Sequence, residues 1–236
     1  MKEKAIAKRT LVDEVELLSP LPPLPPRPST AEHAASVLRA QIAAGRLPPG
    51  TRLREEQIAD SFAISRNTVR EVFRLLAHER LVDHVANRGV HVRRLSAQDI
   101  SGMYRTRRLV EPLGLRAAIA DAQVRSAMRA AVDRATAAAE QNDWDKVGTE
   151  DIEFHRALMD GCHSVHLSAM FEKLLAELRL AFLLLPNPEQ LHGPYLARNR
   201  RILELVEAGD EAAVFAELDE YLTCSEVHVL QSIDAD

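Results

Sequence analysis

The sequence contains the hexapeptide Ser65-Arg66-Asn67-Thr68-Val69-Arg70, and the residues on either side of it indicate the kind of domain to which it belongs. A short helix is expected just before it, over residues 55–63, and Ser65 is a good N-cap for a second helix that starts within the hexapeptide. The inner face of that second helix would consist of Val69, Val72, Phe73 and Leu76. Two short helices joined by a tight turn predict a helix-turn-helix.

The flanking segments extend this pattern into a winged helix-turn-helix. On the N-terminal side, apolar residues at helical spacing predict a helix over residues 31–44, which Gly45 would end. On the C-terminal side, residues 81–85 and 90–92 alternate between apolar and polar side chains, as strands do. The linking tetrapeptide, Ala86-Asn87-Arg88-Gly89, would give the wing a basic tip.

The polar side chains of the hexapeptide suit the major groove of double-stranded DNA. Arg66 and Arg70 could each make a bidentate pair with guanine or hold a phosphate, while Asn67 could read adenine. Ser65 and Thr68 are better suited to phosphate, which positions a protein without specifying sequence. The alternative is that the two arginines only solvate an exposed helix face.

At the wing tip, Arg88 and Gly89 are expected to reach a neighbouring minor groove or the DNA backbone. The coincidence of this basic tip with the N-cap and the arginines of the hexapeptide favours DNA binding over a merely solvated surface.

These residues resemble the winged helix of GntR-type bacterial transcription regulators. The likeness runs from about residue 31 to 94 and is carried by Gly45-x-Leu47-x-Pro49-Gly50, Leu53, Ile58-Ala59, Ser65-Arg66-x-x-Val69-Arg70-Glu71 and Asn87-Arg88-Gly89. One departure is Asn67-Thr68, where many members have Thr-Pro. This departure is expected to tune base preference more than to abolish binding.

Charge separates the chain into parts of opposite sign. Taken over the whole chain, the net charge of −5 for 236 residues disfavours a nucleic-acid partner. Residues 28–94, however, hold eleven arginines and seven acidic residues, about +4, whereas residues 95–236 carry about −10. We therefore expect a proline-rich leader at 1–28, a basic DNA-binding domain at 29–95 and an acidic domain at 96–236.

The composition excludes several other classes of protein. No apolar run approaches the roughly 18 residues of a membrane span, and the N-terminus lacks the apolar core of a secretory signal. Two cysteines, Cys162 and Cys224, are too few for a disulfide framework and are expected to be reduced. A cytoplasmic protein without a membrane partner is the expectation.

The acidic region predicts an all-α helical bundle with a ligand pocket. The six expected helices are 97–121, 123–141, 143–161, 163–184, 194–208 and 210–230. The region resembles the C-terminal (FCD-type) ligand-binding domain of the FadR branch of GntR regulators, and six helices match the shorter VanR-like subgroup. The motifs that carry this likeness are Arg107-x-x-Val110-Glu111-Pro112, Asp143-Trp144, Asp151-x-x-Phe154-His155-x-x-Leu158 and Ile202-x-x-x-x-Glu207-Ala208-Gly209-Asp210.

The resemblance implies a divalent metal site, of which only half is present. Many members bind zinc, nickel or manganese through an Asp, a His four residues later and two further His residues. Asp151 and His155 match the first pair, but the later positions hold Asn199 and Tyr221, which are weaker ligands. A bound metal is therefore disfavoured, unless another histidine compensates; the candidates are His163, His166, His192 and His228.

The alternative is a metal-free polar pocket. There Asp151, His155, Asn199 and Tyr221 would converge with Arg107, and this set suits a small organic acid. The competing interpretation pairs Arg107 with Glu111, four residues on, at the surface.

Together the two regions predict a transcription regulator, most simply a repressor, whose affinity for its operator changes with a small-molecule effector. It would bind a palindromic operator as a homodimer and would not be an enzyme. Two alternatives remain at this point: a metal-dependent hydrolase with an accessory DNA-binding module, and an architectural DNA-binding dimer without a ligand.

Overall fold

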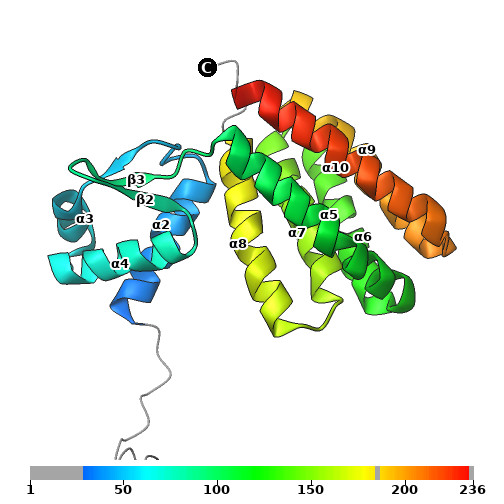
Figure 1. Ribbon diagram of the computed structural model, residues 1–236, viewed down its shortest axis with the longest axis horizontal. Helices are drawn as coiled ribbons and strands as arrows, with labels where there is room; N and C mark the ends of the chain where they lie inside the picture. The colour runs from blue at the N-terminus through cyan, green and yellow to red at the C-terminus, as the bar shows by residue number, and fades with distance from the viewer. Residues whose placement is uncertain (1–28, 184–186, 234–236) are drawn as a thin grey trace, which may run out of the picture.

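The computed structural model describes residues 29–183 and 187–233 and confirms the predicted fold class, a winged helix-turn-helix followed by an all-α bundle (Figure 1). The predicted proline-rich leader, residues 1–28, lies outside the described residues. Within the described part, no helix is both long and apolar enough for a bilayer crossing.

The N-terminal domain has three helices and a small antiparallel sheet, with strand order β1-β3-β2. Its elements are α2 (Thr30–Ala43), β1 (Arg52–Leu53), α3 (Glu55–Phe62), α4 (Arg66–His78), β2 (Val82–Val85) and β3 (Gly89–Val92). The two residues of β1 were not predicted as a strand. They are too few for an alternating pattern, and β1 forms because Arg52 and Leu53 pair with His91 and Val90 of β3.

The helices of this domain begin and pack as the sequence predicts. Ser65 caps α4 by accepting a hydrogen bond from the Thr68 backbone N–H at 3.1 Å. Ala63 adopts a left-handed φ of 53°, which ends α3 and makes the tight turn. All four residues predicted for the inner face of α4 are completely buried, namely Val69, Val72, Phe73 and Leu76.

The C-terminal domain contains the six predicted helices. They are α5 (Ala97–Ala120), α6 (Ala122–Glu140), α7 (Trp144–Asp160), α8 (Val165–Phe182), α9 (Pro188–Ala208) and α10 (Glu211–Ile233). The largest error is the start of α9, which was predicted at Pro194. The helix begins six residues earlier because Asn187 caps it and Pro188 occupies its first turn, where a missing N–H costs nothing.

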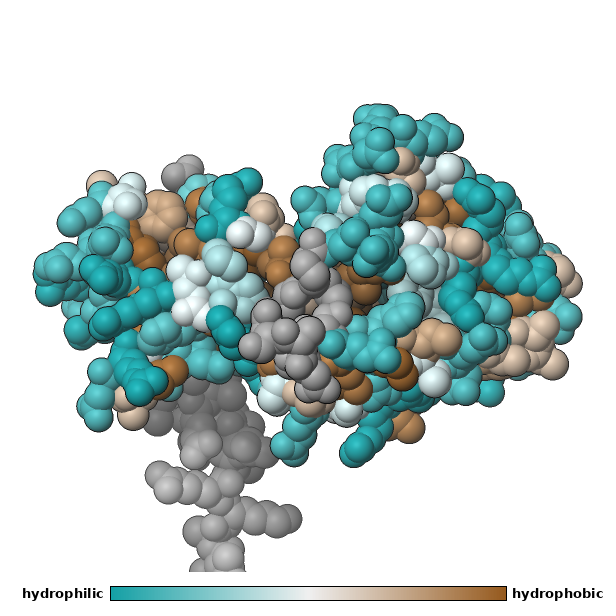
Figure 2. Space-filling view, turned by 90° about the horizontal axis from the view of Figure 1, so that it is seen from above, coloured by the Kyte–Doolittle hydropathy of each residue, from teal (hydrophilic) through white to brown (hydrophobic). Residues whose placement is uncertain are grey.

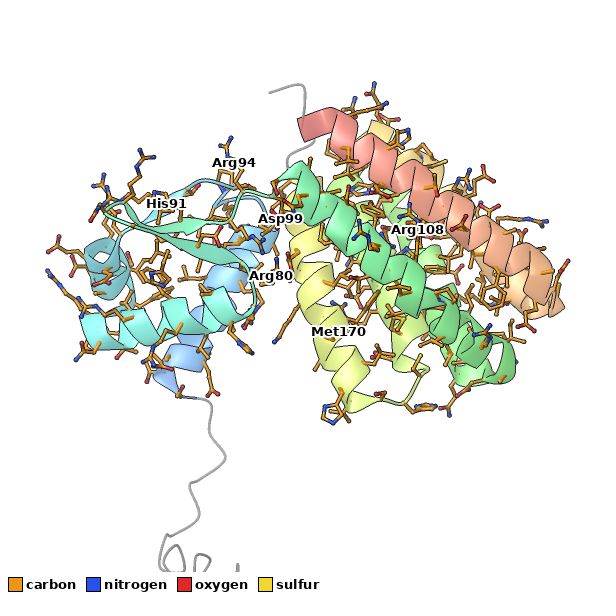
Figure 3. The ribbon with its side chains drawn as sticks, in the orientation of Figure 1. Arg80, His91, Arg94, Asp99, Arg108 and Met170 are labelled. Atoms are coloured by element: carbon orange, nitrogen blue, oxygen red, sulfur yellow. The ribbon has the colours of Figure 1, made fainter. Side chains whose placement is uncertain are left out.

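The two domains meet along helix α8. Arg179 of α8 donates a hydrogen bond through Nε to the carbonyl oxygen of Ala43, at the end of α2, at 2.9 Å. Lys173 Nζ lies 2.9 Å from His78 Nε2 at the end of α4. Arg80 lies at the same junction, beside Asp99 at the start of α5 (Figure 3).

Hydrophilic side chains cover most of one face of both domains, with apolar residues in smaller patches (Figure 2). Buried apolar residues of the two domains form one continuous cluster, so apolar packing as well as polar contacts joins the domains.

Candidate functional site

The first turn of α4 is presented to solvent at the end of the domain that points away from the helical bundle. Ser65, Arg66, Asn67 and Arg70 are exposed, and Thr68 is half-buried. Figure 1 shows that α3, the start of α4 and the β2–β3 turn all lie at this same end. A helix N-terminus here offers backbone N–H groups and the positive end of its dipole to an anion.

Two carboxylates that the sequence analysis missed face the predicted recognition arginines. Arg70 donates through Nε to Glu55 of α3, at 3.1 Å and 3.2 Å to its two carboxylate oxygens. Arg66 donates through Nη2 to Glu56, the next residue of α3. The sequence did contain a signal for these ion pairs, because Glu55 and Glu56 are adjacent at the start of α3, the helix that precedes the recognition helix.

The wing tip has the backbone geometry of a tight turn. Asn87 and Gly89 have φ values of 60° and 87°, and Arg88 donates its backbone N–H to the Val85 carbonyl at 3.0 Å. Arg88 and Gly89 are both exposed. Arg88 thus lies in the turn beyond the last ladder pair, Val85 with Gly89, and is open to solvent.

In the helical domain, the four predicted residues Asp151, His155, Asn199 and Tyr221 come from three helices and are all buried. Asp151 Oδ1 accepts a hydrogen bond from Asn199 Nδ2 at 2.6 Å and another from the Tyr221 hydroxyl at 2.8 Å. The His155 and Tyr221 rings meet edge to face, with centroids 5.1 Å apart. Burial and the Asp151 carboxylate raise the pKa of Tyr221 well above its usual value, so the phenol stays protonated.

Arg107 joins this cluster through a partner that was expected at the surface. Its Nε donates to Glu111 Oε1 at 2.5 Å, and the two side chains are 1% and 0% exposed. The other Glu111 oxygen lies 2.9 Å from His155 Nδ1. Burial would raise the pKa of Glu111, but Arg107 and His155 lower it to about 2. The competing interpretation, a surface pair of Arg107 with Glu111, is confirmed in its pairing and wrong in its placement, because the pair is fully buried.

The side chains present do not fit a divalent metal. Asn199 and Tyr221 direct a donor nitrogen and a hydroxyl hydrogen at Asp151, where a metal would need lone pairs. Over residues 29–183 and 187–233, no three His, Cys, Asp or Glu side chains gather as a metal site would require. The donor chemistry therefore departs from the metal site that the resemblance implied.

The other histidines do not complete such a site. His192 is buried against the Phe182 ring, with centroids 5.0 Å apart, and burial lowers its pKa although Asp151 opposes that shift. His228 Nδ1 lies 2.7 Å from the Tyr195 hydroxyl. His163 is exposed, 3.7 Å from Asp121.

A cleft of about 1130 Å³ lies between the two domains, lined by residues of α2, α4, α7 and α8. None of the five predicted ligand residues lines it. The polar cluster around Asp151 is instead closed within the bundle, since its members are 0–6% exposed.

Comparisons with known proteins agree with this architecture. Residues 30–92 match the description "Bacterial regulatory proteins, gntR family", and residues 102–223 match the FCD domain. A solved structure of a GntR transcriptional regulator from Rhodococcus sp. RHA1 is 37% identical, with a TM-score of 0.80, covering 85% of this chain and 97% of that one.

Curated relatives point the same way. The HTH-type transcriptional regulator YdhC of Bacillus subtilis is 28% identical over 185 residues, which is 75% of this chain and 80% of that protein. The galactonate operon transcriptional repressor of Escherichia coli is 28% identical over 210 residues, 78% of this chain and 80% of the relative. The chain therefore belongs to the GntR family and is a DNA-binding transcription regulator with a C-terminal FCD domain.

Proposed function

We propose that this regulator is a repressor that binds a two-fold symmetric operator as a homodimer and changes its operator affinity when a small organic acid binds the FCD domain. The observation that carries the proposal is the exposed first turn of α4, with Arg66 and Arg70 one turn apart at the end of the domain where the wing tip also lies. One such helix per half-site would match the symmetry of a dimer.

Each residue of this interface has a proposed role. Arg66 and Arg70 read guanine or hold phosphate, and Asn67 reads adenine. Ser65 and Thr68 contact the DNA backbone. Their hydroxyls are 2.8 Å apart, and the one that accepts this hydrogen bond keeps its own hydrogen for a phosphate. The remaining contacts are assigned to Arg88 and Gly89 at the wing tip, which reach the adjacent groove.

The effector is proposed to be a carboxylate bound among Arg107, His155, Asn199 and Tyr221, with Asp151 completing the site by orienting the Asn199 amide and the Tyr221 hydroxyl. In the part of the chain that the structure describes, Arg107 Nη2, His155 Nε2 and Asn199 Oδ1 are buried without a hydrogen-bond partner. Such groups are costly unless paired, so they favour a polar guest or water. A relative named for the galactonate operon, galactonate being a carboxylate, supports the same class of effector.

Access to this closed cluster would require the helices around it to separate, and that requirement supports a regulatory role. A ligand that binds a more open arrangement of the bundle more tightly than the closed one shifts the population toward the open arrangement. The size of the shift is limited by the difference between the two affinities. No metal and no catalytic step form part of this proposal, and the protein would act in the cytoplasm, where its operator is.

The dimer is proposed to form through apolar side chains that the helical domain exposes. Leu109 and Leu113 lie one turn apart on α5 and are 72% and 47% exposed. Val165 and Met170 of α8 are 82% and 40% exposed, and Figure 3 labels Met170 on this helix. The adjacent pair Leu109 and Leu113 favours a protein interface over isolated surface residues, and a second copy satisfies the two-fold operator.

A mobility-shift assay on the region upstream of the protein's own gene tests the DNA-binding part. Arg66→Ala and Arg70→Ala are each expected to weaken operator binding by about 1–3 kcal/mol. Arg129→Ala, at an exposed arginine of the helical domain, is the charge-matched control. Binding by both recognition-helix variants at the strength of the control would refute the assignment.

Thermal-shift measurements test the effector part. Stabilisation by an organic acid in the presence of a chelator, lost in Arg107→Met, is the expected result. Metal-dependent stabilisation that His155→Ala abolishes would instead restore the metal site.

A further inference from the structure

The two carboxylates that face the recognition arginines form a feature that the proposed function leaves unused. Glu55 and Glu56 are consecutive in the first turn of α3, and they bind arginines that lie four residues apart on α4. Two ion pairs therefore link α3 to α4 within the helix-turn-helix, at the end of the domain where DNA is expected to bind. All four side chains remain exposed to solvent by at least a third.

We propose that Glu55 and Glu56 are specificity-determining residues, acting as internal counter-ions that lower the affinity of Arg70 and Arg66 for non-specific DNA. This inference rests on the proposed function, because it assumes that these arginines meet DNA. The carboxylates are positioning residues, since they act through the arginines rather than on the bases.

The geometry of Arg70 explains why its ion pair with Glu55 does not prevent contact with a specific base. Glu55 engages only Nε, and within the described residues neither Nη1 nor Nη2 of Arg70 makes a hydrogen bond. The terminal nitrogens are thus left free for the two acceptors of guanine, O6 and N7. Arg70 can therefore read a base while it remains paired to Glu55, and the pair fixes the plane of the guanidinium.

Non-specific DNA offers these arginines only phosphate. A phosphate must compete with a carboxylate already in place, and it also approaches the negative charge of that carboxylate. Fewer phosphates are neutralised as a result, so fewer counter-ions are released and the salt dependence of non-specific binding is shallower. The Arg66–Glu56 ion pair competes with phosphate most directly, because Glu56 occupies the terminal nitrogen Nη2 of Arg66.

The test compares Glu55→Gln and Glu56→Gln with wild-type protein by fluorescence anisotropy, using the full chain throughout. One probe is a mixed-sequence 30-base-pair duplex, and the other is a duplex that the wild-type protein selects from a randomised pool. Glu71→Gln is the matched control, because Glu71 pairs with Arg74 further along α4 and its loss changes the charge of the domain equally.

Each variant is expected to bind the mixed-sequence duplex about two- to five-fold more tightly than the control does, since exposed ion pairs are weak. The slope of log K against log salt is expected to steepen by about 0.9 for each phosphate gained. Affinity of Glu55→Gln for the selected duplex is expected to change less, because Glu55 leaves the terminal nitrogens of Arg70 free, so the ratio of specific to non-specific affinity falls. Glu56→Asp, which keeps the charge, is expected to restore most of the wild-type slope.

The proposal is overturned if non-specific affinity and salt slope move no further than in Glu71→Gln. A role confined to stabilising the start of α3 would lower the melting temperature and leave the slope unchanged, which also overturns it. The proposed function fails separately, through wild-type binding of the selected duplex by Arg66→Ala and Arg70→Ala.

Discussion

Arg93 of the DNA-binding domain and Glu177 of the FCD domain form an ion pair across the domain junction, with 3.1 Å between Nη1 and Oε2. The two side chains are 11% and 7% exposed. Arg80 Nε approaches the other Glu177 oxygen at 3.0 Å, and Arg93 also contacts Asp99 at 2.5 Å. Burial raises the pKa of Glu177, whereas Ser96 and the two arginines lower that of Asp99 although burial opposes the shift. Glu177 is thus the carboxylate through which α8 holds two arginines of the winged helix.

Replacing Glu177 by glutamine is expected to loosen this junction. Arg80 and Arg93 would each keep Asp99 but lose their second carboxylate, and because Arg93 is largely buried the expected cost is about 1–3 kcal/mol in the free energy of unfolding. Urea denaturation measures the change, with Glu172→Gln as the control, because Glu172 lies on the same helix but pairs with Arg156 within the FCD domain. Equal free energies of unfolding for the two variants would show that the Glu177 pairs at the junction stabilise the protein no more than the Glu172–Arg156 pair does.

Glu111→Gln is expected to destabilise the protein in a way that depends on pH. The pKa of Glu111 is lowered from 4.5 to about 2 in the folded protein, so its contribution is fully present above pH 4.5 and is lost as pH falls through about 2. At neutral pH the variant leaves Arg107 buried beside a neutral amide, a cost of about 3–5 kcal/mol. Urea titrations between pH 7 and pH 2.5 should show that the difference in free energy of unfolding between wild type and variant becomes smaller below pH 4.5. A difference that stays constant with pH would contradict this prediction.

Tyr221→Phe is expected to cost about 1.5–3 kcal/mol, because it removes a hydrogen bond to a buried carboxylate. A double-mutant cycle with Asp151→Asn should give a coupling energy of similar size. Tyr195→Phe is the matched control, since that hydroxyl contacts His228 and not Asp151. A cycle between Tyr195→Phe and Asp151→Asn is expected to be additive, and additivity in the Tyr221 cycle would disprove the pairing.

The double substitution Leu109→Glu and Leu113→Glu is expected to produce monomers. Charges on the exposed face of α5 would oppose burial against a second copy, while the fold tolerates them because both positions face solvent. Light scattering after gel filtration should report 26.3 kDa for the variant and twice that mass for wild type. Val227→Glu, at an exposed position of α10, serves as control, and a dimeric double variant would move the interface elsewhere.

Local patterns predicted the parts of the fold that depend on local physics. The N-cap at Ser65 and the apolar spacing of α4 were sufficient to place that helix, because capping and burial act within a few residues. The wing followed from alternation and from a turn that requires left-handed backbone at Asn87 and Gly89. These features need no knowledge of the rest of the chain.

The parts that were missed depend on contacts between distant residues. An arginine and a glutamate four residues apart look like a surface pair, but Glu111 is buried where α7 brings His155 against it. The pairs of Glu55 with Arg70 and of Glu56 with Arg66 depend on the angle at which α3 crosses α4. The spacing of residues along the sequence does not indicate the angle at which two helices cross.

The contact of Arg179 with the end of α2 defines which piece of this protein could be transplanted. Arg179 caps Ala43 of the winged helix, and Phe182, one helical turn later, packs on His192 inside the FCD domain. A chimera that joins residues 29–95 to a foreign sensor would lose that cap together with the partners of Arg80 and Arg93. The portable unit is therefore the winged helix together with the first turn of α5, which holds Asp99, and the last three turns of α8, and sensor exchange is expected to work only when both segments are carried along.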